Sequence, residues 1–238
     1  MSRNPAFGVT SVVCMMLLAM PCSAETPADP AGKDVSVLVL LGEWFGDAYF
    51  PLAERIEACG WRMSRVGVDS SYRGCYNKAR DVLLHSDILI KDLTDFSDYD
   101  CLIIPSGPQF RKFITNEAVL QFVRDAYGAG LLLASFCTGN MVVTASGLYE
   151  TPEGSWPSPE TVTLVKERIL LGPRGGGPPP GDGYRSAPID ALCGAIAKQL
   201  GVAYADSSSP PTSGAPEAAG TELPVGTSEP TKSGKDVP

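Results

Sequence analysis

Gly130-Leu131-Leu132-Leu133-Ala134-Ser135-Phe136-Cys137-Thr138-Gly139-Asn140 is an apolar run that ends in a cysteine and turns, at a glycine, into helix-forming sequence. So short a run between glycines is typical of a buried strand in a parallel sheet. Cys137 therefore lies where the strand passes into a helix. A sharp turn of this kind lifts the side chain off the sheet, and the helix N-terminus favours a thiolate. The stretch predicts a nucleophilic cysteine, although a buried cysteine also packs as a small apolar residue.

The sequence on either side of this stretch supplies further strands and helices. Apolar, β-branched runs predict strands, and apolar residues at helical spacing predict helices that begin near proline or end at glycine. The predicted strands cover 35–41, 61–68, 98–104 and 168–171, and the predicted helices cover 51–59, 115–127, 141–146 and 188–200. Strand, helix and strand in this order form a βαβ unit, so we expect an α/β fold with a parallel sheet. The interval 69–91 gives no clear pattern.

The two ends of the chain differ in composition from its middle. Arg3, the apolar run 12–20 and the small residues up to Ala24 predict a signal peptide over 1–24. We therefore expect export, to the periplasm or the medium. A lipoprotein with lipidated Cys22 and an uncleaved anchor are the alternatives. Beyond the signal we expect a linker over 25–34, one domain over 35–205 and, because large apolar residues are almost absent there, a disordered tail over 206–238.

The net charge and the cysteine pattern argue against several classes of partner and site. A formal net charge of -8 argues against nucleic acid and anionic membrane surfaces as partners, because binding phosphate requires a positive field. Two of the seven cysteines would leave with the signal, and the five others have no CxxC spacing. Their pattern predicts neither a zinc site nor a full disulfide framework. At least one thiol stays unpaired within the chain, and we interpret Cys137 as that thiol.

Three stretches make the chain similar to the ThiJ/PfpI superfamily, the class I glutamine-amidotransferase-like group of flavodoxin-like proteins. They are Gly46-Asp47-Ala48-Tyr49-Phe50-Pro51, Asp98-Tyr99-Asp100-Cys101-Leu102-Ile103-Ile104-Pro105-Ser106-Gly107 and Ala134-Ser135-Phe136-Cys137-Thr138-Gly139. The resemblance covers 35–148 well and 168–201 loosely. It implies a flavodoxin-like α/β sandwich with a mainly parallel central sheet and a strand-to-helix nucleophile elbow.

Within that group the chain most resembles the isonitrile hydratase branch, because Asp47 stands four residues before Pro51 and Cys137 precedes Thr138. The resemblance implies Cys137 as nucleophile, Asp47 as proton donor or acceptor and Thr138 as a hydrogen-bonding helper. It also implies that the backbone N–H groups of Gly107 and Thr138 face an anionic oxygen of a small-molecule substrate. It implies no cofactor and no metal, and it favours a homodimer.

The chain departs from the family in its histidines. Thr138 stands where family hydrolases and amidotransferases place a histidine, and no histidine follows His85. This argues against Cys–His catalysis of the protease or amidotransferase kind. The proline-rich stretch 149–159 also lacks the histidine-bearing strand of some relatives, and the whole segment 149–185 is atypical.

The sequence is therefore compatible with several functions. The first is a small-molecule hydratase or hydro-lyase that uses Cys137 and Asp47. The second is a redox-responsive protein in which Cys137 is oxidised to sulfinic acid, and the third is a binding protein that keeps only the fold. Asp47 could equally be an ordinary loop carboxylate, and Glu43 is the competing acid.

Overall fold

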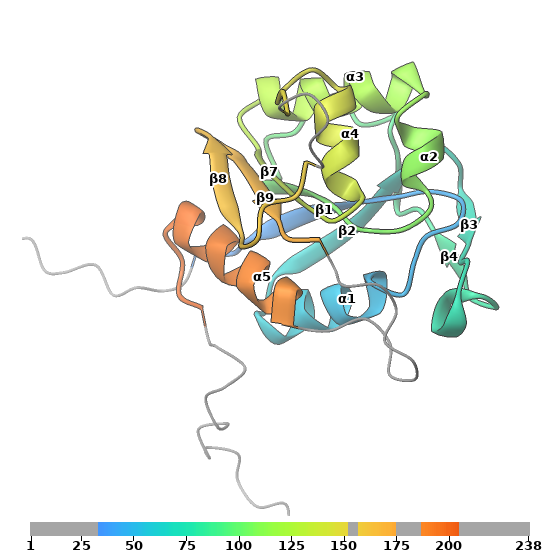
Figure 1. The fold of residues 1–238 in the computed structure, drawn as a ribbon, viewed down its shortest axis with the longest axis horizontal. Helices are drawn as coiled ribbons and strands as arrows, with labels where there is room; N and C mark the ends of the chain where they lie inside the picture. Colours follow the sequence, from blue (N-terminus) through green and yellow to red (C-terminus); the bar gives the residue numbers. More distant parts are fainter. Residues whose placement is uncertain (1–32, 152–156, 175–186, 205–238) are drawn as a thin grey trace, which may run out of the picture. The chain divides into compact units, whose positions relative to one another are not determined.

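A seven-stranded sheet forms the centre of the computed structural model, which describes residues 33–151, 157–174 and 187–204 (Figure 1). Its strand order is β5-β2-β1-β6-β7-β9-β8. The strands are β1 (Ser36–Leu41), β2 (Arg62–Gly67), β5 (Ile88–Leu89), β6 (Cys101–Ile104), β7 (Leu132–Phe136), β8 (Thr163–Lys166) and β9 (Ile169–Gly172). The predictions for 1–24, 206–238 and most of 25–34 lie outside the described residues.

The sheet is parallel except at one edge, where β8 pairs antiparallel with β9. Every residue of the four strands β1, β6, β7 and β9 is buried. Helices cover both faces of a parallel sheet, which explains why these strands read as unbroken apolar runs in the sequence. The predicted α/β fold with a mainly parallel sheet is confirmed.

Helices cover the two faces of the sheet (Figure 1), and the described residues form five of them. They are α1 (Tyr49–Ala58), α2 (Phe110–Phe113), α3 (Glu117–Gly128), α4 (Gly139–Ala145) and α5 (Ala187–Leu200). Alternate residues of β1 point to opposite faces, so Val37 and Val39 pack with α1 and α5, whereas Leu38 and Leu40 pack with α3 and α4. The two-sided core is what the flavodoxin-like sandwich requires.

Within the interval 69–91, residues 71–85 form an antiparallel hairpin beside the main sheet, and β5 of the main sheet follows. The strands of the hairpin are β3 (Ser71–Arg73) and β4 (Leu83–His85), and a short 3₁₀ helix (Asn77–Ala79) lies between them. Each strand holds only three residues, too few for a two-residue apolar alternation to be recognised. Gly74 forms an isolated parallel bridge with Phe45, which attaches the hairpin to the loop that follows β1.

The chain changes direction across the sheet at β1. From β1 it first moves outward to β2, and it later returns to add β6 on the other side of β1. Such a reversal leaves a crevice at the carboxyl ends of the two strands, where open α/β sheets bind ligands. The loops after β1 and β6 therefore mark the edge on which a site is expected.

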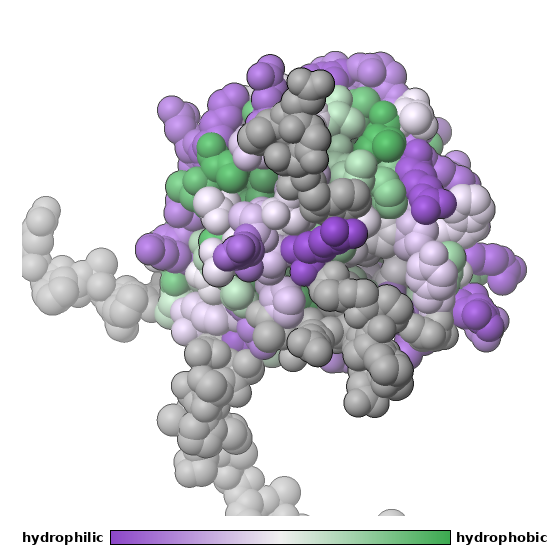
Figure 2. Space-filling view, in the orientation of Figure 1, coloured by the Kyte–Doolittle hydropathy of each residue, from purple (hydrophilic) through white to green (hydrophobic). Residues whose placement is uncertain are grey.

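Surface and helix composition add two observations. Hydrophilic residues cover most of the face shown in Figure 2, with smaller apolar areas between them. Of the helices in the described ranges, none combines the length and apolarity needed to cross a bilayer.

Candidate functional site

Cys137 occupies a strained turn between β7 and α4. Its φ is +52°, in the left-handed region, a conformation that only Trp44 shares among the described residues other than glycine. A residue with a Cβ costs about 1–3 kcal/mol there, and such strain is concentrated at functional sites. The predicted strand-to-helix elbow is therefore present in the backbone geometry, with Cys137 at its turn.

The glycine two residues after the cysteine explains how the turn fits. A Cβ on Gly139 would lie 2.2 Å from the carbonyl oxygen of Ile104, the last residue of β6. Only glycine lets α4 begin so close to the neighbouring strand. The Cys-Thr-Gly order therefore combines a cysteine at the turn with a close approach of the α4 backbone to β6.

Hydrogen bonds hold the peptide groups on both sides of Cys137. Its N–H donates to the carbonyl oxygen of Pro173, directly after β9, at 3.2 Å. Its carbonyl oxygen accepts from the N–H of Asn140 at 3.2 Å and from Oγ of Ser158 at 3.4 Å. The residue is 9% exposed and belongs to the core cluster that contains Phe45. The sulfur thus lies at the boundary of the core.

Thr138 connects the elbow to the loop that follows β6. Its Oγ1 accepts a hydrogen bond from the N–H of Gly107 at 2.9 Å and lies 3.2 Å from Oγ of Ser106. Gly107 N–H was expected to face an anionic oxygen of a substrate. In this structure that hydrogen is directed at Thr138, so a substrate oxygen reaches it only after the threonine side chain rotates.

The loop after β6 also contacts the loop after β1. A Cβ on Gly107 would lie 2.6 Å from the backbone nitrogen of Gly46, the residue before Asp47. The three stretches predicted to form the site, around Asp47, Gly107 and Cys137, are therefore joined in one chain of contacts at the carboxyl edge of the sheet.

The two candidate acids contact the hairpin segment. Asp47 is half-buried, and its Oδ1 accepts a hydrogen bond from the N–H of Ala79 at 2.9 Å. Glu43 accepts from the N–H of Arg73, at the end of β3, at 3.1 Å. Asp47 thus fixes the 3₁₀ helix beside the loop after β1, and its pairing with Cys137 stays a prediction. The only histidine, His85, is exposed on β4 and pairs with Ser71 across the hairpin.

Sequence reasoning missed a buried polar group at the elbow. Asn140 is fully buried on α4 and contacts Ser135, Ser158 and the carbonyl oxygen of Gly172. A fully buried asparagine on the core side of a short helix is unusual. The burial of Asn140 can be recognised as unusual only when the helix is known to begin at Gly139.

The other cysteines divide by environment. All five cysteines of the described residues carry free thiols. Burial raises the pKa of Cys193 to about 12 and that of Cys101 well above its usual range. Burial also raises the pKa of Cys59. A thiol that resists ionisation is a poor nucleophile, so these three are structural.

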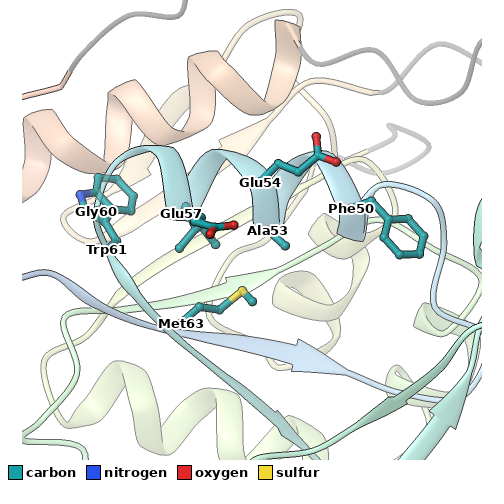
Figure 3. A pocket seen from close by; sticks show the side chains of 8 residues that line it. Phe50, Ala53, Glu54, Glu57, Gly60, Trp61 and Met63 are labelled. Atoms are coloured by element: carbon teal, nitrogen blue, oxygen red, sulfur yellow. The ribbon is translucent and has the colours of Figure 1, made fainter. Parts of the chain in front are cut away.

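Two further features bear on ligands. In the described ranges, no three His, Cys, Asp or Glu side chains are grouped so as to hold a metal ion. A hollow of about 540 Å³ lies between α1 and β2 (Figure 3). Its lining residues are Phe50, Ala53, Glu54, Ile56, Glu57, Gly60, Trp61 and Met63. None of the predicted site residues is among them, so this hollow is separate from the elbow.

Comparison with known proteins places these features in context. The model of the DJ-1/PfpI family matches residues 35–164. A two-domain protein from Anabaena variabilis with DJ-1/ThiJ/PfpI-like and ferritin-like domains has 17% identity and a TM-score of 0.58, over 76% of this chain and 52% of that protein. A DJ-1 superfamily protein from Salmonella typhimurium has 17% identity and a TM-score of 0.55, and the match covers 71% of this chain and 91% of that protein. DJ-1 from Schizosaccharomyces pombe has 16% identity and a TM-score of 0.51, and the match covers 70% of this chain and 92% of that protein. A comparison with curated proteins found no match.

Proposed function

The chain belongs to the DJ-1/PfpI family, and from this we propose that Cys137 is the nucleophile of a cofactor-independent hydratase or hydro-lyase acting on a small electrophilic molecule. One observation carries the proposal: Cys137 keeps a left-handed backbone at the end of β7. A left-handed backbone at a residue other than glycine destabilises the fold. Such strain is expected where it orients a side chain that has a function.

The proposed reaction divides the work between the site residues. The Cys137 thiolate adds to an electrophilic carbon, and Asp47 gives its proton to the atom that becomes negative. Water then adds to the same carbon and loses two protons, one to the substrate nitrogen and one back to Asp47, while the sulfur leaves as thiolate. For an isonitrile the sum is addition of one water to give a formamide. Rotation of Thr138 would offer the N–H of Gly107 to the negative atom.

A turnover assay with point variants tests this proposal. We expect the purified chain to hydrate isonitriles or 2-oxoaldehydes, and Cys137→Ser to lose more than about a hundredfold in kcat/KM because the nucleophile is absent. Asp47→Asn should lose about ten- to a hundredfold, in the range of general acid–base contributions. Cys75→Ser, at a half-buried thiol of the hairpin segment, is the matched control and should keep full activity. Turnover that survives Cys137→Ala would overturn the proposal.

The location of His85 favours a second candidate function. The one histidine of the chain lies on β4, so neither β7 nor α4, the elements on either side of Cys137, supplies an imidazole base. Oxidation of a thiolate by peroxide needs no such base. Two equivalents of peroxide convert the thiolate to sulfenate and then to sulfinate, and release two waters. A gain of two oxygens on the Cys137 peptide at low peroxide, without turnover of any substrate, would support a redox-responsive role.

Export is the third part of the proposal. Its support is the pattern of residues 1–24, with Arg3, an apolar run and a small-residue end. Mass spectrometry of the chain made in a bacterial host should find a mature N-terminus at Glu25. A mature chain that begins at Met1 or at a lipidated Cys22 would contradict cleavage at this point.

A further inference from the structure

Asn140 links three separate parts of the chain around the elbow. Its Oδ1 accepts a hydrogen bond from Oγ of Ser135 on β7 at 2.7 Å. Its Nδ2 donates to the carbonyl oxygen of Gly172, at the end of β9, at 2.9 Å, and to Oγ of Ser158 at 2.8 Å. Asn140 and Ser135 are both 0% exposed. Both donors of the amide are therefore used in a site that excludes water.

The partners of Asn140 also fix which way its amide points. A carbonyl oxygen can only accept, so Gly172 must face Nδ2 rather than Oδ1. The hydroxyl of Ser135 is then free to donate to Oδ1. The arrangement has a single consistent set of donors and acceptors, and a buried network that is fully satisfied gives a rigid structure.

This network ends on the peptide groups of Cys137. Ser158 accepts from Asn140 and donates in turn to the carbonyl oxygen of Cys137 at 3.4 Å. The backbone N–H of Asn140 donates to the same oxygen at 3.2 Å. On the other side, the N–H of Cys137 donates to Pro173, the neighbour of the Gly172 that Asn140 holds. The left-handed backbone of Cys137 is thus clamped from both sides by groups that Asn140 connects.

We propose that Asn140 is a positioning residue: it holds Cys137 in its left-handed conformation and so directs the sulfur to the carboxyl edge of the sheet. Without Asn140, the strain of the left-handed conformation is relieved by rotation of the Cys137 backbone. The sulfur then leaves the orientation in which it reacts. The inference rests on the proposed function, since it assigns a role to the same thiol, but its test does not need a substrate.

The test is the rate at which iodoacetamide alkylates Cys137, followed by peptide-resolved mass spectrometry between pH 6 and 10. We expect Asn140→Ala to lower the rate at pH 7 by about tenfold and to change the shape of the pH profile, because reactivity depends on how the thiolate is held. Ser146→Ala is the matched control. Ser146 is also a buried polar residue of the α4 region, but its Oγ donates to Val143 within the helix. Its variant should be alkylated at the wild-type rate.

Ser158→Ala provides a second variant in case Asn140→Ala does not fold. It removes the hydroxyl that connects Asn140 to Cys137 and keeps the amide in place. We expect a rate lowered about two- to threefold. Unchanged or raised rates in both variants would overturn the positioning role. A lowered rate in a protein that turns over no substrate would leave the positioning role intact and contradict only the proposed function.

Discussion

The side-chain oxygen of Thr138 accepts a 2.9 Å hydrogen bond from the backbone N–H of Gly107. The same oxygen lies 3.2 Å from Oγ of Ser106. Gly107 and Ser106 are both buried, so without Thr138 they would lose a partner where water does not replace it. Thr138 therefore supplies the acceptor for the N–H group that we propose to bind a substrate oxygen.

Replacement of Thr138 by its apolar isostere should destabilise the fold. Thr138→Val leaves the N–H of Gly107 buried without an acceptor, which costs about 1–3 kcal/mol. Thr138→Ser keeps the hydroxyl and should retain most of the stability. Urea denaturation measures both. Equal stability of the two variants would show that the hydroxyl is not needed by Gly107.

The strain at Cys137 predicts an unusual ranking of two substitutions. Cys137→Gly relieves the left-handed strain, whereas Cys137→Ala keeps it, so the glycine variant should be the more stable by about 1 kcal/mol. Thermal and urea denaturation give the difference. Ala134→Gly, on the preceding strand β7 where the backbone is ordinary, is the control and should destabilise. A glycine variant less stable than the alanine variant would refute strain at the elbow.

The ion pair of Asp87 and Arg65 predicts a dependence of stability on pH. Asp87 accepts from both the guanidinium and the backbone N–H of Arg65, and the hydrogen bonds from Arg65 hold the pKa of Asp87 below its usual value. Since the unfolded chain binds this proton more tightly, the stabilisation is present above about pH 4 and is lost as the pH falls through the folded pKa. Asp87→Asn should lower the unfolding free energy at pH 7 by only about 0.5 kcal/mol, because both partners are partly exposed and solvent screens the pair.

The difference between wild type and Asp87→Asn should therefore shrink as the pH falls from about 5 to 3. Urea denaturation at each pH provides the measurement. Asp81→Asn, at an exposed carboxylate of the same segment, is the control and should change little. A difference that stays constant over this pH range would show that the charge of Asp87 is not involved.

Tyr204 predicts a loss of stability at alkaline pH. Its hydroxyl accepts from Nε of Arg55 and donates to the carbonyl oxygen of Asp190, both at 2.8 Å, and burial raises its pKa to about 12. The folded state keeps this proton more tightly than the unfolded state, so its stabilisation is complete below about pH 10 and is lost as the pH rises toward 12. The wild type should lose more stability over this interval than Tyr204→Phe.

At neutral pH, Tyr204→Phe should itself be less stable by about 1–2 kcal/mol, because Arg55 and Asp190 each lose a hydrogen bond. Chemical denaturation between pH 7 and 12 gives both results. Tyr76→Phe, at a tyrosine that is 54% exposed, is the control. A parallel alkaline decline in wild type and Tyr204→Phe would contradict the role of this hydroxyl.

Burial explains which parts of the fold could be predicted from the sequence. Strands such as β7 are enclosed on both faces, so their residues are apolar throughout and easily recognised. The predicted helix over 115–127 also begins at a local signal: in α3 the side chain of Asn116 accepts from the N–H groups of Ala118 and Val119. The strand β8 was missed because it lies at the sheet edge, where Leu164 is 42% exposed and the apolar signal is weak.

The backbone geometry of the elbow could be predicted because its residues are adjacent in sequence, whereas contacts between residues far apart in the sequence could not. The elbow at Cys137 follows from a strand, a cysteine and a glycine within a few residues. The partnership of Asn140 with Ser158 and Gly172 joins distant parts of the chain, and no periodic pattern indicates it. Likewise, nothing in the sequence near Gly107 shows that its N–H is directed at Thr138.

The hydrogen bond from Cys137 to Pro173 has a consequence for how the protein matures. As the chain leaves the ribosome, the cysteine emerges well before the strand that supplies its acceptor. Until β9 docks beside β7, the acceptor for the N–H of Cys137 is not in place. The elbow is thus assembled late, and a chain that stops before Pro173 would carry every residue of the Cys-Thr-Gly turn without the clamp that orients it.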